Sequence, residues 1–476
     1  MDMDEPSKAN GAGSGGAVVA AGIGGAGTMN VSAAASGRGA GGAAGTSPPM
    51  SAAGTNGNAA ASGGRGMPAP MNDTTLRGKL IDLYRRPVVG ATLHIDDKIA
   101  IKTATTDASG KFTVEGVGAT YDVAFKFETA SEGEPTTYAW LFEGVSRRDP
   151  TLQVYRSADF QRGQLTLRAS GVTFPLQGDR NILAGFSSPD GDYFQPLTEA
   201  ETVVNPSWLG PPELSSGTVH AMLRRTAPAS GLITLEVLAY DSKPVTLSNR
   251  VPTQVALDFS GPSLPMGTIA GRANVPGEGP RTNWVRMRWR DNAFLPISEE
   301  TPGPDSFSYF VPSVPDASLM FVAIRGTVGS RPLALGIADD LSVGKSDIQV
   351  DVPAWSSLTA PADTKSNVDE STLFQWRNEA KISMFVANES EGNDVMYVVT
   401  AAKEAHLAMV PKVPYTPRAG ATFEWFVTTH GDFASMDEAT GPDGFISAYS
   451  YAQVHGPRRG PGSFTSSASR TFTTPL

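Results

Sequence analysis

Polar and apolar residues alternate along most of the chain after about residue 75. Leu93 and Ile95 fall on one face of the segment ATLHIDD, and every second residue of YDVAFKF, from Tyr121 to Phe127, is apolar. A hydrophobic period of two is typical of strands that bury one face. Because this period recurs up to the C-terminus, the pattern predicts an all-β fold.

Length and composition extend this prediction to several modules. The chain has 476 residues, enough for three or four domains of about 100 to 150 residues each. Hydrophobic residues make up 40% of it, which allows real cores, and its 51 glycines and 36 prolines favour turns over helices. We therefore expect a disordered N-terminal tail followed by a chain of about four β-sandwich modules. The expected units are a tether at 1–73 and modules at 74–158, 159–261, 262–353 and 354–476.

The first 73 residues have a composition that cannot form a core. Residues 6–72 contain no acidic and no aromatic residue and are mostly Gly, Ala and Ser, which predicts a flexible, disordered tether. A G-x-G-x-x-G match at Gly22, Gly24 and Gly27 lacks the following helix and the acid about 20 residues further on that a dinucleotide site needs. We attribute it to chance in a glycine-rich tract.

The segment TTDASGKFTVEGV contains an acid that could serve chemistry or a turn. Asp107 and Gly110 stand at the first and fourth positions of a predicted type I turn, and Phe112 and Val114 follow in alternation. We interpret Asp107 as a structural turn residue.

In the first ordered segment, the turn residues and the spacing of the strands together follow the pattern of a known family. The residues that match are Gly78, Asp82, Pro87, Gly90, Ala91, Thr106, Asp107, Gly110, Phe112, Val114 and Tyr121. With them, residues 75–155 resemble the carboxypeptidase regulatory-like family of transthyretin-type β-sandwiches. The resemblance implies that this module is a non-catalytic sandwich.

The next two units share a weak internal repeat of about 100 residues. RGQLTLRASGVTFP at Arg162 parallels MGTIAGRANVPG at Met266, and the ends of the two units match as well. This predicts two related β-sandwiches, at 159–261 and 262–353.

The last unit has a proline-led entry before an apolar strand that ends in Trp376. Later, Phe423, Trp425 and Val427 form an alternating face. With this spacing, residues 354–476 resemble a fibronectin type III-like module, which implies that Trp376 is its buried strand tryptophan.

Charge and targeting signals limit the partners. The net charge of −10 argues against nucleic acid as a partner, and no apolar stretch is long enough for a transmembrane span. The absence of cysteine excludes disulfides, cysteine nucleophiles and a lipid-anchored cysteine in this sequence. The tether is similar to those of bacterial surface lipoproteins, although no signal peptide or lipobox cysteine is present. We expect an exported protein, at the cell surface, outer membrane or periplasm, and hypothesise that its true start lies upstream of Met1.

Catalytic and metal-binding motifs are weak. The five histidines, His94, His220, His406, His430 and His455, show no ligand spacing, and no G-x-S-x-G elbow occurs. We therefore predict no enzyme and no cofactor, with calcium as the one candidate ion. Its expected ligands are Asp432, Asp437, Glu438 and Asp443, and the alternative is that these acids only solvate a long loop.

The segment RTNWVRMRWRDNAF is the best candidate for a ligand site. On a strand, Trp284, Arg286, Arg288 and Arg290 point to one side and Val285, Met287 and Trp289 to the other. If the first face is exposed, a tryptophan among arginines suits sugars or anionic groups. The alternative is that Trp284 is covered by a neighbouring module and the arginines pair with local acids.

These observations predict a non-enzymatic, surface-tethered protein that binds or adheres to a polymeric ligand, a polysaccharide or a cell-surface protein. Two other functions stay open. One is a structural spacer or assembly protein without a ligand, and the other is an accessory or catalytic part of a hydrolase.

Overall fold

A computed structural model describes most of the chain after residue 73. The described residues are 74–82, 86–130, 135–154, 160–188, 191–209, 214–227, 232–289, 294–328, 330–369, 371–378, 380–392, 394–401, 404–408, 416–431, 433–442 and 462–476. The expected tether at 1–73 lies outside them. Within the described residues the regular secondary structure consists of strands, apart from the short helix α1 (Met436–Ala439), which confirms the predicted all-β fold.

The strands fall into four consecutive sets, which we call modules 1 to 4. Module 1 comprises β1 (Leu76–Asp82), β2 (Thr92–Asp96), β3 (Ile101–Thr105), β4 (Lys111–Val114), β5 (Tyr121–Ala130), β6 (Pro135–Val145) and β7 (Thr151–Val154). Module 2 comprises β8 (Phe160–Arg162), β9 (Gln164–Ser170), β10 (Arg180–Ser188), β11 (Gly191–Leu197), β12 (Glu201–Val204), β13 (Ser207–Leu209), β14 (Leu214–Thr226), β15 (Thr234–Ser248) and β16 (Pro252–Asp258).

Modules 3 and 4 complete the chain. Module 3 comprises β17 (Met266–Asn274), β18 (Arg281–Trp289), β19 (Phe294–Glu300), β20 (Ser306–Pro312), β21 (Ala317–Arg325), β22 (Leu333–Leu341) and β23 (Ile348–Asp351). Module 4 comprises β24 (Ser357–Ala360), β25 (Leu373–Arg377), β26 (Ile382–Glu389), β27 (Val395–Thr400), β28 (Glu404–Ala408), β29 (Thr422–His430), α1, β30 (Gly462–Ser466) and β31 (Arg470–Thr473).

Modules 1, 2 and 3 share one topology. In each, the first strand of the common set (β1, β9 or β17) pairs antiparallel with one neighbour and parallel with the last strand of the module. The second sheet then runs β3-β2-β5-β6, β11-β10-β14-β15 or β19-β18-β21-β22. Two sheets facing each other bury the apolar half of each alternating strand, which is the physical basis of a sandwich.

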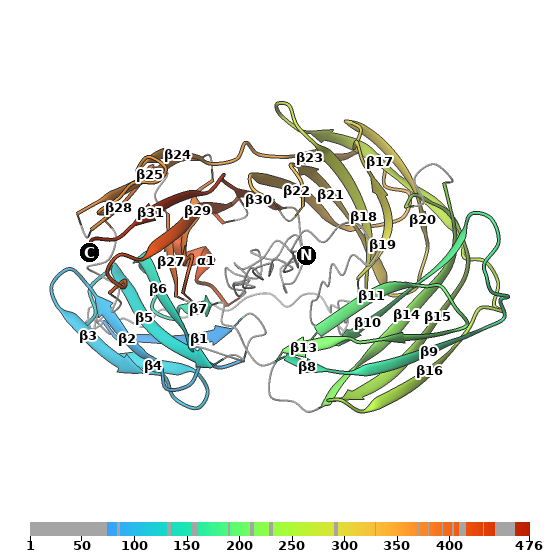
Figure 1. The fold of residues 1–476 in the computed structure, drawn as a ribbon, viewed down its shortest axis with the longest axis horizontal. Coiled ribbons are helices and arrows are strands. Elements are labelled where there is room, and N and C mark those ends of the chain that lie inside the picture. The colour runs from blue at the N-terminus through green and yellow to red at the C-terminus, as the bar shows by residue number, and fades with distance from the viewer. Residues whose placement is uncertain are drawn as a thin grey trace, which may run out of the picture.

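Three of the modules are joined edge to edge. β6 of module 1 pairs parallel with β27 of module 4, and β30 of module 4 pairs antiparallel with β22 of module 3. The result is one 13-stranded sheet in the order β19-β18-β21-β22-β30-β29-β26-β27-β6-β5-β2-β3, with β31 paired to β29. Figure 1 shows modules 1 and 4 together on the left and modules 2 and 3 on the right.

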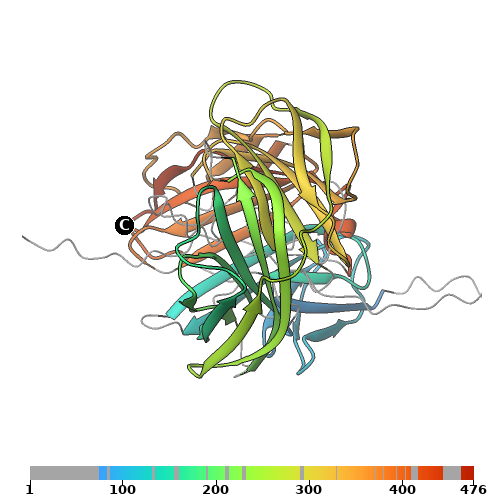
Figure 2. The same cartoon turned by 90° about the vertical axis from the view of Figure 1, so that its right-hand side faces the viewer.

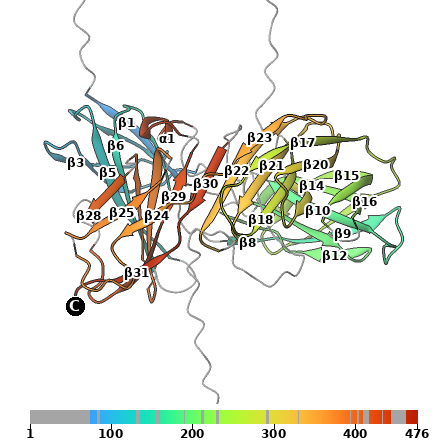
Figure 3. The same cartoon turned by 90° about the horizontal axis from the view of Figure 1, so that it is seen from above.

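Module 2 is attached through its face and not through its edge. Its sheet β11-β10-β14-β15 is separate from the 13-stranded sheet, yet Leu183, Met222 and Val237 belong to the same hydrophobic cluster as the core of module 3. Figure 2 shows the strands of modules 2 and 3 in front, and Figure 3 shows the two halves of the molecule side by side from above.

Candidate functional site

The predicted ligand strand, β18, is buried on both faces. Val285, Met287 and Trp289 lie in the core of module 3, as their alternation predicts. Trp284 lies on the opposite face in another hydrophobic cluster, which also contains residues of modules 1 and 4, and it is only 8% exposed. The prediction of an exposed tryptophan–arginine face was therefore wrong, because β18 lies inside a sheet that other modules extend and cover.

The arginines of this face have local partners. Arg288 forms an ion pair with Asp339 of β22, and both side chains are buried. Arg286 is buried as well, with its guanidinium 4.3 Å from the centre of the Trp284 ring. Arg290 lies outside the described residues. This arrangement agrees with the alternative reading, a covered tryptophan beside arginines that pair within the protein.

The predicted calcium loop is only partly described. Asp432 and Asp443 lie outside the described residues, and the part of the chain that the structure covers holds no group of three or more potential metal-ligating side chains. Glu438 accepts a hydrogen bond from the Ala434 amide at 2.7 Å, which holds its carboxylate against its own loop.

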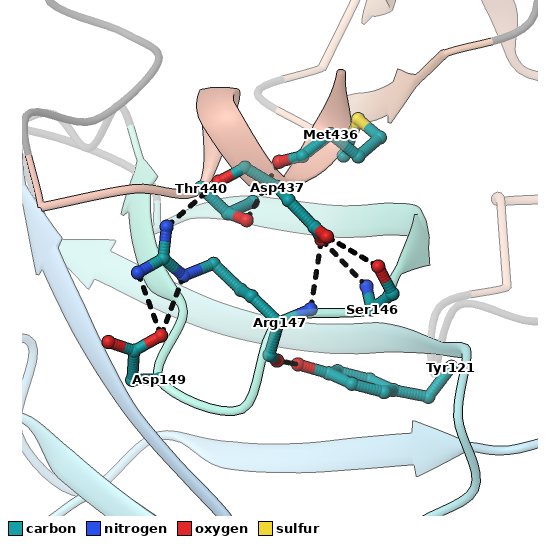
Figure 4. A network of polar contacts seen from close by, with 7 residues as sticks. All are labelled: Tyr121, Ser146, Arg147, Asp149, Met436, Asp437 and Thr440. Carbon is teal, nitrogen blue, oxygen red and sulfur yellow. Dashed lines mark hydrogen bonds and ion pairs between the residues drawn. The ribbon is translucent and has the colours of Figure 1, made fainter.

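Asp437 has a different role, because it docks helix α1 against module 1 (Figure 4). Its carboxylate accepts hydrogen bonds from the amides of Ser146 and Arg147, both at 2.9 Å, and from the Ser146 hydroxyl. Burial raises the pKa of Asp437, but these hydrogen bonds outweigh it and hold the pKa below its ordinary value. The Arg147 guanidinium returns a hydrogen bond to the Asp437 carbonyl at 2.9 Å.

The loop that receives α1 is anchored within module 1. The Tyr121 hydroxyl donates to the Arg147 carbonyl at 2.5 Å, and the Thr151 amide donates to the Thr440 carbonyl at 2.7 Å (Figure 4 shows the first of these). Sequence analysis placed Asp437 in a metal site because the acids of its loop are close in sequence. No sequence signal pairs it with Ser146, which lies 291 positions away.

The turn at Asp107 has the geometry of a hairpin cap. The Gly110 amide donates to the Asp107 carbonyl at 2.9 Å, and the Asp107 carboxylate accepts from the amides of Ser109 and Lys111. Gly110 has a φ of +73°, and a Cβ there would lie 2.5 Å from the Leu80 carbonyl oxygen. Glycine is therefore required for both backbone and packing reasons.

The junction between modules 2 and 3 contains a buried arginine, Arg224. Its guanidinium donates to the Asn181 side chain at 2.7 Å, to the Pro296 carbonyl at 2.9 Å and to the Ile297 carbonyl at 3.2 Å. Burial lowers the pKa of Arg224 to about 10. Because two of these acceptors belong to β19, the side chain ties module 2 to module 3.

Two of the histidines belong to the described core. His220 stacks on Trp289 with ring centroids 4.1 Å apart and bonds the Tyr240 hydroxyl through Nδ1 at 2.8 Å, which adds to the junction of modules 2 and 3. His430 is fully buried beside Phe464, and burial lowers its pKa to about 3. A neutral, buried imidazole of this kind serves packing.

The β2–β3 hairpin presents two exposed isoleucines that sequence analysis did not single out. Ile99 is 89% exposed and Ile101 is 69% exposed. Asp97 holds the tip, because its carboxylate accepts from the amides of Ala100, Ile99 and Gly118 and from Lys102. These hydrogen bonds, that of the Ala100 amide foremost, keep the pKa of Asp97 well below its ordinary value. The segment DDKIAI could have drawn attention, since isoleucine is unusual at a hairpin tip.

A cavity of about 310 Å³ lies where modules 3 and 4 meet, beside Ala354, Lys381 and Phe433. The Thr429 hydroxyl at its wall is already hydrogen-bonded to Thr465 at 2.6 Å.

None of the described helices is both long and apolar enough to cross a membrane.

Comparisons with known proteins give no family. No family model matches the chain, and no curated protein matches it. Solved structures do match over parts of it. The minor pilin of Streptococcus agalactiae is 12% identical with a TM-score of 0.16, over 38% of this chain and 94% of the pilin. The major pilin subunit of Bacillus cereus is 10% identical with a TM-score of 0.14, over 59% and 99%. A Ca²⁺-stabilised adhesin with which an Antarctic bacterium binds ice is 10% identical with a TM-score of 0.13, over 75% and 94%.

Proposed function

We propose that this protein is a non-enzymatic, exported or surface-attached adhesion protein whose modules act as one rigid body toward a polymeric ligand, a glycan or a protein. The observation that carries the proposal is the 13-stranded sheet that runs through modules 1, 3 and 4. A shared sheet replaces flexible linkers with a ladder of backbone hydrogen bonds, so the modules cannot swing independently. A rigid body presents its outer loops and strands at fixed spacings, which favours multivalent contact with a repeating polymer.

The ligand would meet loop tips and outer strands, because both faces of β18 are occupied inside the protein. The proposal includes two family assignments. Module 1 would be a carboxypeptidase regulatory-like sandwich, and module 4 would be a fibronectin type III-like sandwich.

Retention on polymers tests the proposal directly. The full chain would be applied to a glycan array and to isolated envelope polysaccharides and proteins, beside a panel of chromogenic hydrolase substrates. We expect saturable retention on at least one polymer and no turnover. Turnover of any substrate in the panel, or no retention on any polymer, would contradict the proposal.

A second candidate is a structural or assembly protein without a ligand. The observation that favours it is that β3, among the described strands, pairs only with β2. Self-association without polymer retention would select this candidate. The hypothesis of a hydrolase would require a cleft in which a histidine lies within hydrogen-bonding distance of a serine and an acid.

A further inference from the structure

The two edge strands of the 13-stranded sheet, β19 and β3, differ in what covers them. At one end, module 2 covers β19, where Ile233 forms a bridge with Ser298 and the Glu299 amide donates to the Leu232 carbonyl at 3.2 Å. At the other end, β3 pairs with β2 alone among the described strands. An uncovered edge strand offers a row of backbone donors and acceptors to another strand.

This edge carries only part of the usual protection against pairing. Natural edges are protected by short strand length, charged side chains, proline or bulges, and β3, with the sequence IKTAT, is short and has one lysine but no proline and a regular register with β2. Its one charge, Lys102, is paired with Asp97 at 3.0 Å. Ile99 and Ile101, both strongly exposed, extend the apolar surface of the edge to the hairpin tip.

The hairpin that carries this edge is rigid before any partner arrives. The Asp97 carboxylate binds three backbone amides, and Lys98 adopts a left-handed φ of +68° with its amide bonded to Asp96 at 2.8 Å. The Lys98 ammonium also forms an ion pair with Asp122 of β5. A preorganised strand loses little conformational entropy on pairing.

The hydrogen-bond phase of the ladder determines which groups of β3 point outward. The Asp97 amide bonds the Ala100 carbonyl, and the Thr106 amide bonds the Ala91 carbonyl. Hydrogen-bonded and non-bonded pairs alternate in an antiparallel ladder, so Lys102 and Ala104 face β2 with their backbone groups. The N–H and C=O groups of Ile101, Thr103 and Thr105 therefore point away from the sheet.

These outward groups are self-complementary. A two-fold axis at Thr103 would place Ile101 opposite Thr105 of a second copy and Thr103 opposite itself, and every outward group would find a partner. Lys102 would lie opposite Ala104, so no like charges would face each other.

We propose that β3 is a self-association site, at which β3 of a second copy of this chain pairs antiparallel around a two-fold axis at Thr103 and joins two 13-stranded sheets into one. The molecule already uses the same contact internally, where β22 pairs antiparallel with β30. The proposal goes beyond the proposed function, and either could fail without the other.

Sedimentation velocity of the full chain over a concentration series up to about 1 mM tests for the dimer, since a Kd of 1 mM corresponds to only about −4 kcal/mol. We expect a concentration-dependent dimer that Ile101→Lys weakens at least tenfold. Val251→Lys in module 2, at a valine that is 51% exposed, is the control and should dimerise like the unchanged chain. A monomer at every concentration, or a dimer that Ile101→Lys leaves unaltered, would overturn the proposal.

Crosslinking through introduced cysteines tests the register. The chain has no cysteine of its own, so only the introduced residues can form disulfides. In Thr103→Cys the paired Cα atoms would lie about 5.5 Å apart, within disulfide range, so mild oxidation should give a covalent dimer. Ile101→Cys alone should not crosslink, because its two copies would lie about 13 Å apart along the strands. Ile101→Cys combined with Thr105→Cys should crosslink again.

Equal crosslinking of all three proteins would indicate random collision and overturn the register. A Thr103→Cys chain that stays monomeric by itself but crosslinks to a different envelope protein would assign the edge to that protein and overturn self-association. Unchanged thermal unfolding of each variant shows that the fold is retained.

Discussion

Trp140 of β6 stacks on Tyr397 of β27, with ring centroids 4.2 Å apart, across the parallel strand pair that joins module 1 to module 4. Both rings are fully buried in the largest hydrophobic cluster of the described residues. The stack therefore joins two modules through residues that lie 257 positions apart in sequence.

Removing one ring of this stack should loosen the joint between modules 1 and 4. We expect Tyr397→Ala to cost about 3 to 5 kcal/mol in the free energy of unfolding, because it leaves a cavity against Trp140. Tyr397→Phe keeps the ring and should cost much less. Urea unfolding followed by tryptophan fluorescence measures both, and equal losses for the two variants would show that the ring contact is unimportant.

Arg224 and its neighbour Arg225 form a matched pair for the junction of modules 2 and 3. Arg224→Ala should cost about 3 kcal/mol, since it leaves the buried carbonyls of Pro296 and Ile297 without this donor. Arg225 is 46% exposed and pairs with Asp179 and Glu236 near the surface, so Arg225→Ala should cost less than about 1 kcal/mol. Limited proteolysis between the modules, together with thermal unfolding, distinguishes the two. A larger loss for Arg225→Ala would contradict this role.

The buried ion pair of Arg288 and Asp339 should act as a structural unit and not as a ligand site. Arg288→Ala leaves Asp339 buried without this partner and should cost about 3 to 5 kcal/mol. Arg288→Met combined with Asp339→Leu should recover much of that loss. Retention on polysaccharide should be the same for the folded double variant as for the unchanged chain. If the double variant lost retention on polysaccharide while its stability was unchanged, β18 would be a binding face after all.

Asp437 should make the contact between α1 and module 1 sensitive to acid. Its folded pKa lies below the unfolded value near 3.9, so its contribution is fully present above that value and is lost as the pH falls through the folded pKa. Asp437→Asn should lower the melting temperature at pH 7 and flatten its decline in acid. Asp305→Asn in module 3, at an acid whose side chain is 66% exposed, is the control and should change little. Parallel acid profiles for Asp437→Asn and the unchanged chain would refute the assignment.

His430 should make the free energy of unfolding depend on pH in a higher pH range than Asp437 does. Because its folded pKa of about 3 lies below the unfolded value near 6.5, the unfolded chain binds the extra proton between these values. The free energy of unfolding should therefore fall by up to about 1.4 kcal/mol per pH unit as the pH drops below 6.5. Urea unfolding at several pH values should show a shallower slope for His430→Gln. An unchanged slope would assign the effect to other groups.

The alternation of apolar residues predicted the strands well, because burial of one face is a local pattern. In β18, Val285 and Met287 lie on the core side, as their positions require, and Trp284 lies on the other side. What the pattern could not reveal is that the Trp284 side is also buried. A strand with one covered face and a strand with two covered faces differ only in their neighbours, and these come from distant parts of the chain.

The difference between local and distant partners also explains why the role of one acid was predicted correctly and that of another was not. Asp107 bonds residues two and four positions away, so turn chemistry was sufficient to interpret it. Asp437 bonds Ser146, and nothing near Asp437 in sequence indicates that partner.

The sequence by itself determined the all-β class, the strands and the local turns, because hydrophobic alternation and turn residues act over a few positions. Only the tertiary structure decided that three modules share one sheet, that module 2 covers β19 and that β3 pairs with β2 alone among the described strands. Edge pairing uses backbone groups that every residue carries, so side-chain patterns do not specify which edges meet.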